Sequence, residues 1–252
     1  MQMVLLTALG VGGATVVGAV LGFFIKKVSH KFNDIVLAFA AGVMLAAAVI
    51  GLILPSLEYG GRAPLLVTAV GIFCGALCLN LMDKAVPHLH HLAGVDGEAH
   101  PAKTDQLNKV LLFVMAIAIH NLPEGIAAGV GFGTGNTGEA LTIAAGIALQ
   151  NIPEGMVIIA PMLAAGMTSG RTFVIALATG VVEVIGTLLG CFAVSLSNAI
   201  LPFALAFAGG TMLYVISDEM IPETHAHGSE RGATYSLLAG FCLMLAMSYY
   251  LG

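Results

Sequence analysis

The sequence predicts an all-α, polytopic membrane protein with eight transmembrane helices. Of its 252 residues, 58% are hydrophobic and only 9% are charged, and the mean hydropathy is +0.98. A soluble domain carries roughly 25% charged residues, so this composition excludes a soluble globular protein. Uncharged runs at 1–25, 35–57 and 63–82 each reach the ~20 residues that a membrane-spanning helix needs.

Polar and glycine-rich gaps divide the chain into eight spans, which we expect to form one transporter domain over residues 1–252. We expect the first span to be a retained helix, because Lys26, Lys27 and Lys31 follow its apolar run, whereas the charges of a secretory signal precede it. The predicted helices cover residues 3–24, 35–56, 64–82, 108–131, 140–164, 172–194, 200–221 and 233–251.

Positive charge is distributed unevenly between the two sets of loops. Most of the Lys and Arg residues lie in the loops after the first, third, fifth and seventh predicted helices. The loops on the opposite side of the membrane hold only Arg62. Because cytoplasmic loops carry the excess of Lys and Arg, we expect both termini outside the cytoplasm. With a net charge of −5 and no basic cluster beyond residues 26–31, nothing predicts a nucleic-acid partner. The loops after the first, third, fifth and seventh helices hold Lys26, Lys27, Lys31, Lys84, Lys103, Lys109, Arg171 and Arg231.

A short internal match predicts an inverted repeat. Residues 41–45, Ala-Gly-Val-Met-Leu, resemble residues 209–213, Gly-Gly-Thr-Met-Leu, and Pro55 or Pro222 follows each. The two helices are expected to cross the membrane in opposite directions. Inverted repeats are typical of secondary transporters, whose substrate sites lie near the bilayer midplane on broken helices.

The helices 108–131 and 140–164 share a polar motif that contains proline. The first motif is His-Asn-Leu-Pro-Glu-Gly at 120–125, and the second is Gln-Asn-Ile-Pro-Glu-Gly at 150–155. A proline inside a helix frees the carbonyl four residues earlier, and such a group is tolerated in lipid only where protein, water or an ion satisfies it. Two matched breaks therefore predict a polar centre.

The polar residues of several helices share one depth. His120, Asn151 and Glu183 each lie eleven or twelve residues into their predicted helices, so at a rise of about 1.5 Å per residue all are near the bilayer centre. Met44 lies close to the same level. Ionisable groups at that depth are costly and usually functional. The site is therefore predicted to contain Met44, His120, Asn121, Glu124, Gln150, Asn151, Glu154 and Glu183.

Three carboxylates, one imidazole and several amides predict a site for a divalent transition metal. Mixed nitrogen and oxygen donors suit Zn²⁺, Fe²⁺, Mn²⁺ or Cd²⁺. We expect transport of this metal, with no catalytic cofactor and no enzyme activity. The alternative is an intramembrane metal-dependent hydrolase, because bound zinc can activate water. The His-Glu-x-x-His signature typical of zinc hydrolases is absent, however.

The paired Pro-Glu-Gly helices and the eight-helix layout resemble the ZIP family of zinc and iron permeases over essentially the whole chain. The resemblance implies that the helices 108–131 and 140–164 are enclosed by the others, and that zinc moves into the cytoplasm through a binuclear midplane site. It also implies a bacterial-type inner (plasma) membrane protein in the lipid bilayer, and bacterial members of this kind often form homodimers. Many relatives carry histidine in place of Gln150, and some carry aspartate in place of Asn151, which leaves metal selectivity open.

The resemblance divides the site residues between two metal positions, with Glu154 bridging them. One position would use His120, Glu124, Gln150 and Glu154 with Met44 nearby, and the other would use Asn121, Asn151, Glu154 and Glu183.

Several polar residues lie outside this centre. The cytoplasmic loop at about 83–107 contains His88, His90 and His91, which are either transient metal contacts or part of a solvated loop. Asp218 and Glu219 either guide metal along the exit route or are ordinary carboxylates at a helix end.

Three further carboxylates have simple interpretations. Glu58 and Glu139 either attract cations on the outer face or are solvated charges. Asp34 is predicted to cap the helix that begins near residue 35.

Overall fold

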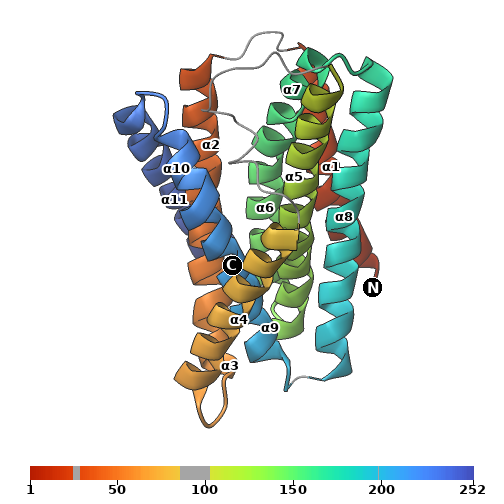
Figure 1. Cartoon of the computed structure of the whole chain (residues 1–252). Coiled ribbons are helices and arrows are strands. Elements are labelled where there is room, and N and C mark those ends of the chain that lie inside the picture. Colours follow the sequence, from red (N-terminus) through yellow and green to blue (C-terminus); the bar gives the residue numbers. More distant parts are fainter. Residues whose placement is uncertain (25–28, 86–102, 198) are drawn as a thin grey trace.

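The computed structural model is a bundle of long helices, with no β-strand among the residues that it describes (Figure 1). These residues are 1–24, 29–85, 103–197 and 199–252, and at positions 83, 85 and 103–116 only the backbone is described. His88, His90 and His91 of the predicted cytoplasmic loop lie outside the described residues.

Seven continuous helices in the described part of the chain are long and apolar enough to cross a membrane, which makes the protein a polytopic membrane protein. α5 is a further helix of 29 residues. In chain order the elements are α1 (Gln2–Phe24), α2 (His30–Ala46), η1 (Ala47–Ile53), α3 (Leu54–Tyr59), α4 (Pro64–Ala85), α5 (Lys103–Gly131), η3 (Phe132–Thr134), α6 (Thr137–Val157), α7 (Ile159–Ala164), α8 (Ser169–Leu196), α9 (Leu201–Val215), η4 (Ile216–Met220), α10 (Ile221–Thr224) and α11 (Glu230–Leu251).

Side-chain caps mark the starts of three helices. The side chains of Ser29, Asn136 and Thr168 accept hydrogen bonds from backbone N–H groups in the first turns of α2, α6 and α8. The prediction that Asp34 caps its helix is wrong, because α2 begins four residues earlier, at His30. Asp34 is instead buried, and its carboxylate lies 3.1 Å from Nδ1 of His227.

Glycine brings the helix backbones together around the two proline motifs. The most extensive helix pairs are α1 with α6, α5 with α8, α2 with α11, and α4 with α9. A side chain on Gly155 of α6 would overlap the backbone of Thr15 on α1, and one on Gly125 of α5 would overlap the backbone of Glu183 on α8. In lipid no hydrophobic effect drives helices together, so their association depends on close packing. Small residues allow the backbones to approach closely. The glycines of both motifs therefore place α1 and α8 against the polar residues.

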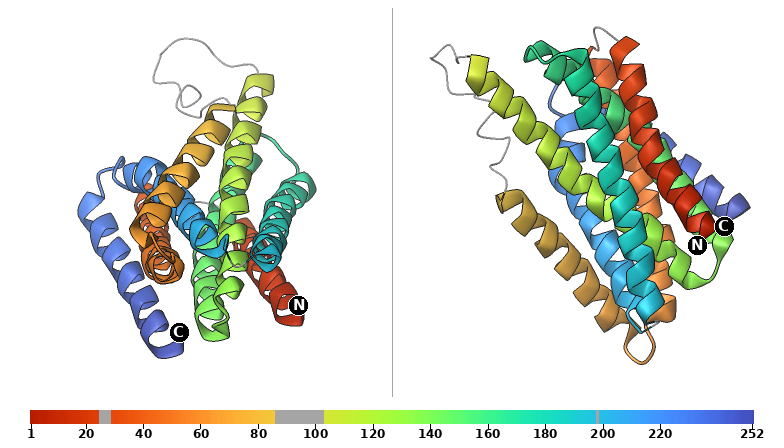
Figure 2. Two further views of the ribbon diagram at one scale, coloured as in Figure 1. Left: turned by 90° about the horizontal axis from the view of Figure 1, so that it is seen from below. Right: turned by 90° about the vertical axis from the view of Figure 1, so that its right-hand side faces the viewer.

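The motif-bearing helices α5 and α6 run through the middle of the bundle (Figure 1). α6 contacts both α1 and α2, and α5 contacts both α8 and α9. Figure 2 shows the same arrangement from two further directions. The polar residues of the motifs are thus supported by neighbours on both sides.

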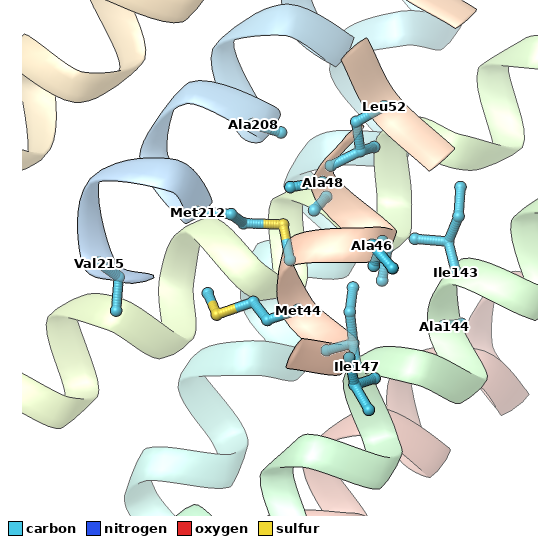
Figure 3. Close-up of a cluster of buried hydrophobic side chains, with 14 of the residues drawn as sticks. Met44, Ala46, Ala48, Leu52, Ile143, Ala144, Ile147, Ala208, Met212 and Val215 are labelled. Atoms are coloured by element: carbon cyan, nitrogen blue, oxygen red, sulfur yellow. The ribbon is translucent and has the colours of Figure 1, made fainter. Parts of the chain in front are cut away.

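Two long helices share an irregular segment ahead of a proline. α2 continues through the π-helical η1 before Pro55, and α9 continues through the π-helical η4 before Pro222. The two helices run in opposite directions in Figure 1. Their matched methionines, Met44 and Met212, are fully buried in one apolar cluster (Figure 3).

Candidate metal centre

The predicted polar site is assembled from three helices, of which α5 packs against both α6 and α8. Pro123 and Pro153 lie inside α5 and α6, within the motifs themselves. Six of the seven polar side chains are buried, and Glu154 is partly buried. The residues are His120, Asn121 and Glu124 on α5, Gln150, Asn151 and Glu154 on α6, and Glu183 on α8.

The first pair in the site joins α6 to α5. Nε2 of Gln150 donates a hydrogen bond of 2.7 Å to Oε1 of Glu124. The other oxygens of these two side chains, Gln150 Oε1 and Glu124 Oε2, are buried and have no hydrogen-bond partner. The amide therefore uses its donor side to hold the carboxylate and leaves its acceptor side unused.

The second pair joins α6 to α8. Nδ2 of Asn151 donates a hydrogen bond to Oε1 of Glu183 and a second, of 3.3 Å, to the backbone carbonyl of Val11. Asn121 on α5 likewise donates to the backbone carbonyl of Thr179 at 3.4 Å. Both amide hydrogens of Asn151 are thereby used. The Oδ1 atoms of Asn151 and Asn121 are buried without a partner.

Four unpaired oxygens therefore gather in the site, and this is the feature that fits a cation. A buried acceptor without a donor costs about 1–3 kcal/mol, and a bound divalent ion would remove that cost. No group of three or more His, Cys, Asp or Glu side chains in the described part of the chain is placed to hold a metal ion. The buried amide oxygens are further donors beside the carboxylates. The four oxygens belong to Asn121, Glu124, Gln150 and Asn151.

His120 connects the centre to η4, the segment that follows the C-terminal end of α9. Its Nε2 lies 3.0 Å from Oε1 of Glu219, which is on the π-helical segment η4. Irregular π-helical turns are frequent at functional sites. The neighbouring Asp218 is exposed. The structure therefore brings Glu219, but not Asp218, to a residue of the predicted centre.

Met44 lies in the apolar part of the core. It is fully buried in the cluster that also contains Ile147 and Met212 (Figure 3). Its role as a sulfur ligand stays a prediction.

Sequence reasoning missed the contribution of α1. Thr15 donates a hydrogen bond of 2.7 Å to Oε2 of Glu183, and the Val11 carbonyl accepts from Asn151. A signal for this was present in the sequence. Residues 12–22 have the pattern Gly-x2-Thr-x2-Gly-x3-Gly, and residues 180–190 repeat it with glutamate in place of threonine.

A cavity of about 200 Å³ opens at another part of the bundle. Glu58 and Glu139 both line it, and no basic residue does. The two carboxylates are thus placed together, as a cation-attracting surface requires. The remaining lining residues are Ile50, Gly51, Leu54, Pro55, Thr142, Ile143, Met244 and Ser248.

The fold and the centre together define a polytopic membrane protein with buried carboxylate and amide oxygens at its core. The family model described as ZIP zinc transporter matches residues 96–248, which include both proline motifs and Glu183. The chain belongs to the ZIP family of zinc transporters, and the family prediction is confirmed.

Named relatives cover nearly the whole chain. It is 40% identical to the zinc transporter GufA of Myxococcus xanthus, an alignment covering 98% of both proteins. It is 38% identical to the zinc transporter ZIPB of Bordetella bronchiseptica, over 95% of this chain and 78% of that protein. The zinc transporter ZIP11 of Homo sapiens is 31% identical, over 95% of this chain and 94% of that protein. These relatives support metal transport and give no support to the hydrolase alternative.

Proposed function

We propose that this protein carries zinc, or a similar divalent metal such as iron, manganese or cadmium, across the membrane into the cytoplasm. The observation that carries the proposal is the set of four buried, unpaired oxygens between carboxylates on α5, α6 and α8. Neutral and anionic oxygens together attract a divalent cation, and burial strengthens that attraction because the effective dielectric constant is low. The names of the relatives agree with zinc as the cargo.

The centre holds two metal positions in this proposal. The Gln150–Glu124 pair, with His120, forms the first position, and the Asn151–Glu183 pair forms the second with Asn121. Zinc draws these side chains closer when it binds, because no three His or Glu side chains in the described part of the chain are placed to hold an ion without it. Glu154, four residues after Gln150 on the same helix face, bridges them. Ligands must lose protons before they bind metal, so zinc binding releases protons from the carboxyl groups.

The topology that we propose has eight spans, which are the seven helices identified above together with α5. Both termini lie outside the cytoplasm in this topology. An inverted repeat is supported by the paired packing, in which α1 lies on α6 as α8 lies on α5, and α2 lies on α11 as α9 lies on α4. The matching π-helical segments before Pro55 and Pro222 also support it.

The route through the protein follows from the acidic residues on either side of the centre. Metal ions first meet the cavity lined by Glu58 and Glu139, where two carboxylates raise the local cation concentration. On leaving, the ion passes His120 to Glu219, which is already within 3.0 Å of that imidazole. The cytoplasm is the destination in this proposal, because the loops that hold Lys31, Lys84 and Arg171 carry the excess of positive charge.

Zinc uptake into proteoliposomes with an internal zinc-sensitive dye tests this function. We expect uptake by the wild type and its loss in His120→Ala and Glu154→Ala at matched protein incorporation. Glu230→Gln, which removes an exposed carboxylate at the start of α11, is the control and keeps wild-type uptake. A folded wild type that moves none of zinc, iron, manganese or cadmium would refute the proposal.

A further inference from the structure

α1 and α8 occupy matching places around the centre. Where they cross, Gly12 and Gly180 each pack against the other's backbone. One residue before each glycine, a backbone carbonyl accepts from a motif amide, Val11 from Asn151 and Thr179 from Asn121. Three residues after each glycine stands the side chain that faces the centre. That side chain is Glu183 on α8 and Thr15 on α1.

The hydroxyl of Thr15 differs from those of three other buried threonines in its hydrogen-bond partner. Thr179, Thr187 and Thr211 each donate to a carbonyl three or four residues earlier on their own helix. That local bond is the usual partner of a hydroxyl inside a helix. Thr15 is 1% exposed and donates across to Oε2 of Glu183 at 2.7 Å instead.

The bond from Thr15 completes a chain of donors that fixes the second metal position. Oε2 of Glu183 accepts from Thr15, and Oε1 accepts from Asn151. The second hydrogen of Asn151 is held by the Val11 carbonyl, so the Oδ1 atom of this amide is left as an acceptor for the metal. We propose that Thr15 is a positioning residue that holds Glu183 for the second metal, which makes α1 part of the transport site. This inference rests on the binuclear site proposed above.

Zinc titration calorimetry of the purified full-length protein tests the role of Thr15. In Thr15→Val we expect the zinc affinity of the second position to fall about tenfold to a hundredfold, the factor expected for one hydrogen bond to a charged group. The zinc affinity of the first position stays within about threefold of the wild type, a change of less than 1 kcal/mol in binding free energy. Thr15→Ser restores the second position because it keeps the hydroxyl, and Thr15→Ala repeats the loss with a smaller side chain.

Thr7→Val is the matched control, because Thr7 is a buried threonine on the same helix. We expect it to leave both positions unchanged. A Thr15→Val or Thr15→Ala protein that loses both positions equally, or that matches Thr7→Val, would overturn the inference.

A double-mutant cycle separates positioning from general packing. When Glu183→Gln is already present, replacing Thr15 by valine is expected to cause no further loss of zinc affinity, because the carboxylate that it positions is gone. Fully additive losses would contradict a positioning role. A wild type that binds no zinc would overturn the binuclear site itself, whereas two bound zinc ions with an inert Thr15 would overturn only this inference.

Discussion

Replacing Gly155 by alanine tests how the motif glycines build the centre. A Cβ atom at this position would overlap the backbone of Thr15, which cannot turn aside as a flexible side chain would. α1 and α6 must therefore move apart. Overpacking of this kind costs about 1–3 kcal/mol, and the higher helix propensity of alanine offsets up to about 1 kcal/mol of it. With the full offset, the net loss of stability is thus between about 0 and 2 kcal/mol.

The same movement weakens the second metal position. The Val11 carbonyl and the Thr15 hydroxyl travel with α1, and ligand distances in a metal site hold to within about 0.2 Å. Zinc affinity and thermal stability in detergent should therefore fall together. Gly13→Ala on α1 is the control, because no atom lies within 4 Å of its Cβ position. Thermal unfolding and zinc titration of both variants measure the effect, and equal behaviour of Gly155→Ala and Gly13→Ala would refute the reasoning.

Three further predictions concern the path of the metal. Glu154→Ala should weaken both zinc positions and Glu183→Ala mainly one, so equal zinc stoichiometry by elemental analysis in the wild type and both variants would count against the assignment. Glu219→Gln removes the charge beside His120 and should lower the maximal uptake rate with little change in KM; an unchanged rate would exclude it from the route. Joint replacement of Glu58 and Glu139 by glutamine should raise KM at low salt, and the difference should shrink near 1 M ionic strength, where the screening length is about 3 Å. A salt-independent KM difference would show that the two carboxylates act by another means.

The long apolar segments were the part of the fold that the sequence made easiest to predict. Each predicted helix range overlaps helical structure. Two of the helices that end later than predicted do so because π-helical turns continue them past a proline. α2 with η1 and α3 extends to Tyr59 past Pro55, and α9 with η4 and α10 extends to Thr224 past Pro222. Asp34 was misjudged for a related reason, since the helix start is set by the Ser29 cap and not by the first apolar residue.

The residues of the centre were predictable because charge inside a membrane helix is rare and the Pro-Glu-Gly motif is repeated. Their partners on α1 were missed, although the glycine spacing shared by residues 12–22 and 180–190 indicated that α1 matches α8. Thr15 carries no charge, and the Val11 carbonyl has no sequence signal of its own. Their role depends on α1 crossing α8 at Gly12 and Gly180, which only the packing reveals. The pairing of His120 with Glu219 likewise joins residues 99 positions apart in the sequence.

Zinc-edge anomalous diffraction from crystals of the zinc-loaded protein tests whether the centre holds two metal ions. We expect two anomalous peaks between α5, α6 and α8, with carboxylate oxygens about 2.0–2.2 Å from each zinc and Glu154 touching both ions. Zinc peaks found only outside these three helices, with the Asn121 and Asn151 oxygens still unpaired, would contradict it.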